Sequence, residues 1–293
     1  MRIVSLLPST TEIVCDLGLA DDLIGVTIEC NWPAGVQEGR EIVVRSFAEP
    51  SMTPGEIDAI VHHRLSEGQD LYTLDDEALQ RCDPDLILSQ DLCRVCAVAS
   101  GDVEAAKVRL NCRADILQID PLTLSQVLAS IATIAGAAGA EERGRAYIGS
   151  LHARLAAVEE AVHGEVRRRV FVLEWIDPPF GAGHWVPDLV RAAGGEPILS
   201  RSGERSESIS WEEIAIADPD VVIVSPCGYG LEQSAAQAQL VLGTLPTTAE
   251  VWAIDADAVM VRPGPRLVEG VEALASLLHG TSPLPTNLVA RIR

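Results

Sequence analysis

Short apolar runs rich in β-branched residues alternate along the chain with longer segments in which aliphatic residues recur at helical spacing. The apolar runs predict strands at residues 2–7, 23–27, 41–44, 85–89, 115–119, 170–174, 221–225 and 251–254. Since helical patterns separate most of these strands, the sequence predicts an α/β fold with mainly parallel sheets.

Two segments have the sequence of a capping box at a helix start. Ser-Thr-Thr-Glu at residues 9–12 predicts a helix that begins at Ser9 and ends at Gly18. Thr-Pro-Gly-Glu at residues 53–56 predicts a second helix, with Pro in its first turn, that continues through His62.

Two internal similarities indicate two lobes of similar plan. Residues 82–89 and 217–224 each combine a helix end, an Asp-Pro step and an apolar strand, and residues 8–18 and 184–194 each place a helix ahead of a glycine. Between them, residues 122–138 and 141–162 form a helical tract without proline. Its second part alone would be about 33 Å long, enough to join two lobes.

The sequence therefore predicts two Rossmann-like α/β lobes joined by a long backbone helix, with a ligand cleft between the lobes. The expected divisions are an N-terminal lobe at 1–121, a connecting tract at 122–165 and a C-terminal lobe at 166–293. Forty-three acidic residues against 22 basic ones give a net charge of -21, which repels phosphate backbones and anionic headgroups. This charge argues against nucleic-acid partners, and no apolar run reaches the length of a membrane span.

The N-terminal residues predict a cytoplasmic location. The apolar residues before Pro8 are too few for the core of a signal peptide, and Cys15 does not follow a small residue as a lipoprotein site requires. Seven cysteines, an odd number, also fit a reducing compartment better than a disulfide framework.

Unusual residues cluster just after the predicted strands, where open α/β sheets bind ligands. The loops concerned are residues 30–32, 45–47, 90–96, 175–185 and 227–229. The chain has only three Phe, three Tyr and five Trp, yet six of these residues fall in the five loops: Trp32, Phe47, Trp175, Phe180, Trp185 and Tyr229. We expect them to form the walls of a site for a large planar ligand, with packing under long loops as the alternative.

Polar residues in or near the same loops are candidate ligand contacts. Arg45 and Gln90 follow two strands directly, and His184 could ligate cobalt or iron or cap the next helix. Arg262 and Arg266 stand on either side of Pro-Gly-Pro and could bind ligand carboxylates or amides, or form salt bridges near a helix start.

The loop cysteines raise a second hypothesis. Cys30, Cys93, Cys96 and Cys227 could together hold zinc or an iron–sulfur cluster, or could be buried as small apolar side chains. The sequence has no phosphate-binding loop, nucleophile elbow or H-E-x-x-H motif, so an enzyme is the less favoured reading.

Seven short motifs, spread over nearly the whole chain, carry a family resemblance. They are Leu-Leu-Pro-Ser-Thr-Thr-Glu (6–12), Glu-Cys-Asn-Trp-Pro (29–33), Leu-Cys-Arg-Val-Cys-Ala-Val (92–98), Glu-Trp-Ile-Asp-Pro (174–178), Gly-His-Trp-Val-Pro (183–187), Pro-Cys-Gly (226–228) and Arg-Pro-Gly-Pro-Arg (262–266). With these motifs, the two-lobe plan resembles the helical-backbone (class III) substrate-binding proteins, which serve importers of vitamin B12, siderophores, haem and metal ions. Within that class the chain is similar to the leaderless cobalamin-binding group and to vitamin B12-binding periplasmic proteins.

The resemblance implies a non-catalytic protein that binds cobalamin, another corrinoid or a similar tetrapyrrole or metal chelate between its lobes. The implied partner is a small-molecule ligand, with an importer or a ligand-using enzyme receiving it. The alternative is the metalloprotein with zinc or an iron–sulfur cluster on its cysteines, which could be an enzyme.

Overall fold

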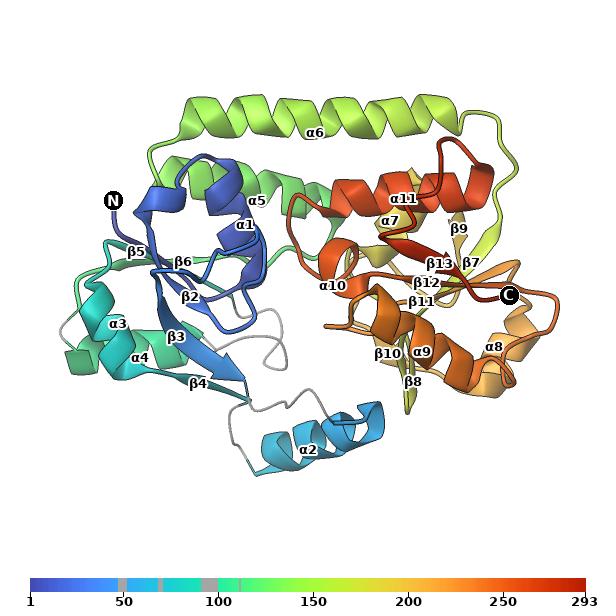
Figure 1. Cartoon of the computed structure of the whole chain (residues 1–293), viewed down its shortest axis with the longest axis horizontal. Helices are drawn as coiled ribbons and strands as arrows, with labels where there is room; N and C mark the ends of the chain where they lie inside the picture. The colour runs from blue at the N-terminus through green and yellow to red at the C-terminus, as the bar shows by residue number, and fades with distance from the viewer. Residues whose placement is uncertain (47–51, 68–70, 91–99, 111) are drawn as a thin grey trace. The chain divides into compact units, whose positions relative to one another are not determined.

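The computed structural model describes residues 1–46, 52–67, 71–90, 100–110 and 112–293 (Figure 1). The chain forms two compact units. Unit 1 consists of Met1–Pro121 and Leu128–Gly149, and unit 2 of Leu122–Val127 and Ser150–Arg293. The helical tract expected as a separate connector is thus divided between the two units.

Unit 1 is built on a six-stranded sheet of order β4-β3-β2-β1-β5-β6. Its strands are β1 (Ile3–Ser5), β2 (Leu23–Thr27), β3 (Glu41–Ser46), β4 (Tyr72–Leu74), β5 (Leu86–Ser89) and β6 (Asp115–Gln118). All neighbouring strands are parallel except β3 and β4. The carboxyl ends of β1, β2, β3, β5 and β6 therefore lie along one edge of the sheet.

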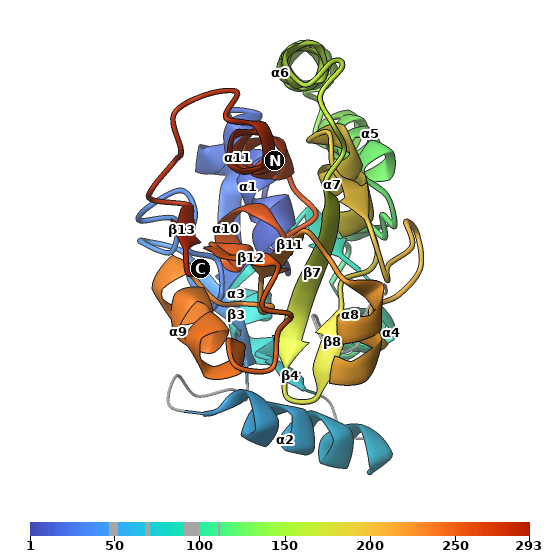
Figure 2. The same cartoon turned by 90° about the vertical axis from the view of Figure 1, so that its right-hand side faces the viewer.

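Helices cover both faces of this sheet. They are α1 (Pro8–Asp16), α3 (Asp76–Cys82) and α4 (Ser100–Leu110), with the 3₁₀ helix η1 (Ala20–Asp22) after α1. Helix α2 (Pro54–Ser66) lies apart from the sheet in Figures 1 and 2. In Figure 1, α1 lies on one face of the sheet and α3 on the other. Apolar side chains of α3 and α4, such as Leu79 and Val103, pack with Val4, Val43 and Ile87 of the strands into a core that is closed to solvent.

The two predicted helix starts had different outcomes. The capping box at 53–56 is confirmed, since Glu56 accepts hydrogen bonds from the Thr53 backbone and hydroxyl, both at 2.8 Å. The capping box at 9–12 is wrong: α1 begins at Pro8, and Leu7 is the N-cap residue. Proline fits the first helical position because its fixed φ and missing N–H cost nothing there.

Unit 2 is built on a seven-stranded sheet with the main order β10-β8-β7-β11-β12-β13. Its strands are β7 (Arg169–Ile176), β8 (Pro179–Gly181), β9 (Glu196–Pro197), β10 (Glu207–Ser208), β11 (Val221–Val224), β12 (Glu250–Ile254) and β13 (Val289–Arg291). The central strands β7, β11 and β12 are parallel, and β9 pairs with β7 in parallel as well. Each flanking strand is antiparallel to its neighbour: β8 to β7, β10 to β8 and β13 to β12.

Two layers of helices enclose the unit 2 sheet. The helices are α7 (Val186–Ala192), α8 (Trp211–Ala217), α9 (Leu231–Val241), α10 (Ala256–Val259) and α11 (Leu267–His279). Helices α7 and α11 lie over one face, and α8 and α9 over the other (Figure 1). Figure 2 shows β7 and β8 side by side as a hairpin.

The first internal similarity is confirmed in detail. The C-cap residues of α3 and α8 are Asp83 and Asp218, and these two residues have left-handed φ values of 43° and 46°. Asp tolerates this conformation better than most residues, and the proline that follows each prevents the helix from continuing. Each segment then enters a buried strand, β5 or β11.

The helical tract consists of α5 (Leu124–Ala137) and α6 (Glu141–Ala161), and each helix contributes to both units. In unit 1, Gly144 lies so close to α5 that an added Cβ would stand 2.5 Å from the Ala135 side chain. In unit 2, Arg154 of α6 pairs with Glu272 of α11 at 2.7 Å. Within the described ranges, no helix has the length and apolar character that a membrane crossing requires.

Candidate functional site

Three aromatic side chains gather at the carboxyl edge of the unit 2 sheet, and we call them the aromatic edge: Trp175, Phe180 and Tyr229. The Trp175 and Tyr229 rings are 5.8 Å apart at an interplanar angle of 59°. Phe180 stands opposite Trp175 in the β7–β8 hairpin. All three are partly buried, so each ring keeps some surface open to solvent. Partial burial also raises the pKa of the Tyr229 phenol.

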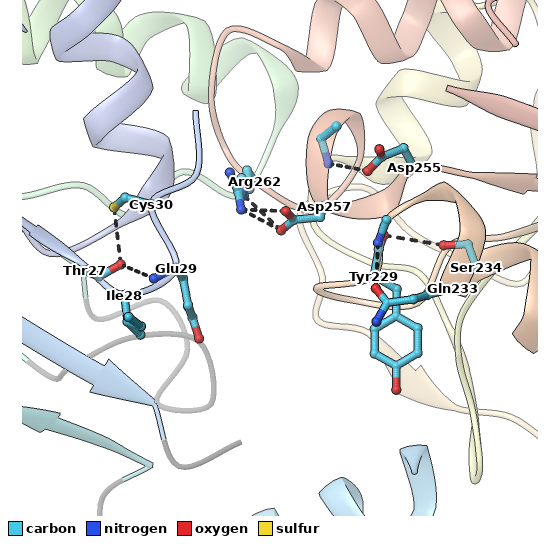
Figure 3. Close-up of polar contacts among 12 residues, drawn as sticks. Thr27, Ile28, Glu29, Cys30, Tyr229, Gln233, Ser234, Asp255, Asp257 and Arg262 are labelled. Atoms are coloured by element: carbon cyan, nitrogen blue, oxygen red, sulfur yellow. Dashed lines mark hydrogen bonds and ion pairs between the residues drawn. The ribbon is translucent and has the colours of Figure 1, made fainter. Parts of the chain in front are cut away.

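An ion pair supports the loop that carries Tyr229. The Tyr229 carbonyl accepts a hydrogen bond from the Asp257 backbone N–H at 3.1 Å, and the Asp257 carboxylate accepts two from one Arg262 nitrogen at 2.7 Å (Figure 3). Arg262 is only 8% exposed. The structure thus shows Arg262 in a salt bridge, one of the two roles expected for it. Arg266 likewise pairs with Glu269, at 3.4 Å.

Glu174 connects three segments around the aromatic edge. It is the extra residue of a β-bulge, because Leu173 pairs with Gly181 and Trp175 with Phe180. Its carbonyl accepts from the Cys227 backbone N–H at 3.2 Å, in the loop that leads to Tyr229. Its carboxylate accepts a hydrogen bond from the Ser206 hydroxyl, whose oxygen lies 2.9 Å from each carboxylate oxygen.

The segment that carries His184 and Trp185 is tightly held. Trp185 is 5% exposed and donates its indole N–H to the Met260 carbonyl at 2.8 Å, so most of its ring is inside the unit. His184 has a left-handed φ of 51°, and its Nε2 atom is buried without a hydrogen-bond partner. Burial, and secondarily Arg205, lowers the pKa of His184. In this conformation Nε2 is covered and is not presented to a metal centre.

At the carboxyl edge of the unit 1 sheet, hydroxyl groups surround a buried thiol. Cys30 is 1% exposed, and its Sγ lies 3.2 Å from the Thr11 hydroxyl and 3.3 Å from that of Thr27. Thr11 donates to Ser5, which also contacts Thr10 at 2.6 Å. These five residues form what we call the thiol–hydroxyl cluster, part of which is drawn in Figure 3.

The other predicted ligand contacts of unit 1 vary in exposure. Trp32 is 42% exposed and Gln90 only 6% exposed. Arg45 extends from β3 into solvent. Phe47 lies outside the described residues.

The structure does not support the four-cysteine metal site. Cys30 is in contact with hydroxyls, Cys227 is an exposed free thiol, and Cys93 and Cys96 lie outside the described residues. No group of three or more His, Cys, Asp or Glu residues that could hold a metal ion occurs in the part of the chain that the structure describes.

Residues 3–263 match the family model described as "Periplasmic binding protein". The chain belongs to this family. It is 24% identical over 292 residues to an uncharacterised ABC transporter substrate-binding lipoprotein of Bacillus subtilis, a match that spans 95% of this chain and 80% of the relative. It is 25% identical over 293 residues to a cobalamin-binding protein of Halobacterium salinarum, covering 96% of this chain and 70% of the relative.

A solved structure of the family shows the same fold. A periplasmic haem-binding protein from Pseudomonas aeruginosa superposes with a TM-score of 0.73 at 19% identity, over 99% of this chain and 97% of the other. The two-lobe α/β fold and the family predicted from the sequence are therefore confirmed, as is non-catalytic ligand binding.

The relatives contradict the predicted cytoplasmic location. One is a substrate-binding lipoprotein and another is periplasmic by description, and both terms place a protein outside the cytoplasm. The prediction was wrong because it rested on the absence of leader features among the first residues of the sequence.

Three residues that support the aromatic edge were not among the ligand contacts predicted from the sequence: Glu174, Ser206 and Asp257. Asp257 lies in the first turn of the short helix α10 and Arg262 follows five positions later, a spacing that could have suggested a local ion pair. The bond between Glu174 and Ser206 spans 32 positions and has no such signal.

Proposed function

We propose that this periplasmic binding protein binds a corrinoid, with cobalamin as the leading candidate, and presents it to an ABC importer without chemical conversion. The aromatic edge is the observation that supports this choice. Partly buried aromatic faces offer large contact area to a planar macrocycle at little cost in side-chain entropy. A relative that shares 25% of its residues with this chain is a cobalamin-binding protein.

Haem is the ligand from which a corrinoid must be distinguished. Haem carries two carboxylates, whereas the corrin ring carries mainly amides, which hydrogen-bond to neutral groups. Of the arginines predicted as ligand contacts in unit 2, Arg262 is engaged by Asp257 and Arg266 by Glu269. That pairing favours an uncharged amide periphery over carboxylates. Gln90 and Arg45 of unit 1 stay predicted ligand contacts, one an amide and the other a cation.

The test is titration of the protein with hydroxocobalamin and, separately, with hemin, followed by tryptophan fluorescence. We expect hydroxocobalamin to quench the fluorescence and to bind more tightly than hemin. Trp175→Ala should weaken hydroxocobalamin binding by about 2 kcal/mol, the loss typical of a buried aromatic anchor. Leu240→Ala is the matched control, since Leu240 is an apolar residue that is 72% exposed in the last turn of α9.

Two results would count against the proposal. If neither compound quenches the fluorescence at tens of micromolar, tetrapyrrole binding is rejected as the function. Tighter binding of hemin than of hydroxocobalamin would keep a tetrapyrrole site but reject the corrinoid.

A further inference from the structure

The loop at residues 203–206 packs directly against the Gly183–Trp185 segment. A Cβ atom added to Gly183 would lie 2.4 Å from the Ser206 nitrogen and 2.6 Å from the Glu204 carbonyl oxygen. Atoms of different residues do not approach so closely, so only glycine fits there. The backbones are also hydrogen-bonded, from His184 to Glu204 and from Gly203 to His184 at 3.0 Å.

The Ser206 hydroxyl completes this contact and extends it to β7. It accepts the Gly183 N–H at 3.1 Å and donates to the Glu174 carboxylate at 2.9 Å. A hydroxyl can do both at once, and its bond to a charged acceptor is stronger than one between neutral groups. Ser206 therefore joins the loop that holds His184 to the bulge that precedes Trp175.

The bulge sets the direction of the aromatic edge. In a regular strand Glu174 and Trp175 would point to opposite faces, and the extra residue changes the local twist and re-aims the following side chain. The carbonyl of Glu174 also holds the Cys227 loop. Fixing the Glu174 carboxylate through Ser206 thus constrains both Trp175 and the loop that carries Tyr229.

We propose that Ser206 is a positioning residue for ligand binding: its hydroxyl, held between Gly183 and Glu174, keeps Trp175 and Tyr229 in the arrangement that receives the ligand. Ser206 itself need not touch the ligand. This inference rests on the proposed function, and it names a residue that contributes through preorganisation.

The experiment compares Ser206→Ala, Ser206→Thr and the control Ser208→Ala, in which a serine of the neighbouring strand β10 loses its hydroxyl. Hydrogen exchange of the Gly183 amide, followed by NMR, reports the positioning contact without ligand. Titration with hydroxocobalamin and hemin reports binding, and thermal unfolding shows whether each variant is folded. Glu174→Gln is a second route, because it keeps the shape of the side chain and removes its charge.

We expect Ser206→Ala to speed Gly183 exchange and to weaken binding by about tenfold, the effect of losing a single hydrogen bond to a charged group. Ser206→Thr should restore both, Glu174→Gln should weaken binding less, and Ser208→Ala should match the wild type. Rescue by threonine separates a role of the hydroxyl from a general loss of packing.

The outcomes distinguish the two proposals. Wild-type protein that binds hydroxocobalamin, with Ser206→Ala binding equally well, overturns the positioning role and leaves the proposed function intact. Unchanged Gly183 exchange in Ser206→Ala also overturns it. Wild-type protein that binds neither compound overturns the proposed function, and the ligand role of Ser206 with it.

Discussion

The carboxyl edge of the unit 1 sheet buries uncharged polar groups, whereas that of the unit 2 sheet combines partly open aromatic rings with an ion pair. Cys30 and Cys227 illustrate the difference. Each follows a parallel strand by a few residues, yet Cys30 is enclosed by threonine hydroxyls and Cys227 is exposed. Arg45 and Arg262 differ in the opposite sense, since the arginine of unit 1 is exposed and that of unit 2 is buried with Asp257.

This comparison shows that position after a strand identifies an edge but does not decide what its side chains do. In unit 1 the hydroxyls of Ser5, Thr10 and Thr11 bond to one another, which satisfies polar groups where water does not reach. In unit 2 the equivalent space is occupied by rings that remain partly accessible. The first edge should therefore contribute mainly to stability and the second mainly to binding.

The largest expected effect on stability comes from the ion pair of unit 2. Arg262→Ala leaves the Asp257 carboxylate without its bidentate partner, and we expect a loss of about 3 kcal/mol in the free energy of unfolding. Urea denaturation measures this. Arg201→Ala is the control, because Arg201 pairs with Glu204 at 3.5 Å in an exposed position and should change stability by less than about 0.5 kcal/mol. Equal losses in the free energy of unfolding for the two substitutions would show that the buried ion pair stabilises the fold no more than the exposed one.

A smaller effect is expected from the two thiols. Cys30→Ala removes a buried contact of two threonine hydroxyls and should cost about 1 to 2 kcal/mol, whereas Cys227→Ser should be neutral. In the native wild-type protein, iodoacetamide should modify Cys227 and not Cys30, as peptide mapping would show. Cys82 should also stay unmodified, since burial raises the pKa of its thiol to about 11. Rapid native labelling of Cys30 would remove the contrast between the two edges.

The smallest effect concerns pH. Because burial lowers the pKa of His184 in the folded protein, the unfolded chain binds a proton at this residue at higher pH than the folded one does. The contribution of His184 to stability is therefore complete above about pH 6.5 and is lost as the pH falls through the folded pKa. His184→Asn, which tolerates the left-handed backbone, should make stability less sensitive to acid. An identical acid response in wild type and variant would assign the sensitivity to other groups.

Hydrophobic patterning predicted the fold well because the central strands of both sheets are buried on both faces. The strands at β2, β5 and β11 were found within a residue of their true ends, and the Asp-Pro similarity located the same turn in each unit. At these strands and turns, the local sequence alone determines the structure. The start of α1 was misplaced by one residue because Pro8 and Ser9 both suit a helix start, and Pro8 occupies the first helical position with Leu7 as the N-cap residue.

The candidate site was less predictable because its geometry depends on contacts between distant residues. Trp185 looked equivalent to Trp175 in the sequence, yet its indole N–H bonds to Met260, 75 positions away, and its ring is buried. The β-bulge at Glu174 arises from pairing with β8 and leaves no trace in the residue pattern. Loops could thus be located from the sequence, whereas the direction of their side chains could not.

The divided helical tract has a consequence for how such proteins can recombine. The chain passes between the units after Pro121, Val127 and Gly149. Arg143 bonds to the Gly18 carbonyl and Tyr147 to Asp16, so these α6 residues must match α1 and the turn that follows it. A hybrid gene with one junction after Pro121 would supply them from the wrong parent. Exchange of unit 1 between relatives requires that residues 128–149 be inherited together with 1–121, although the intervening six residues belong to unit 2.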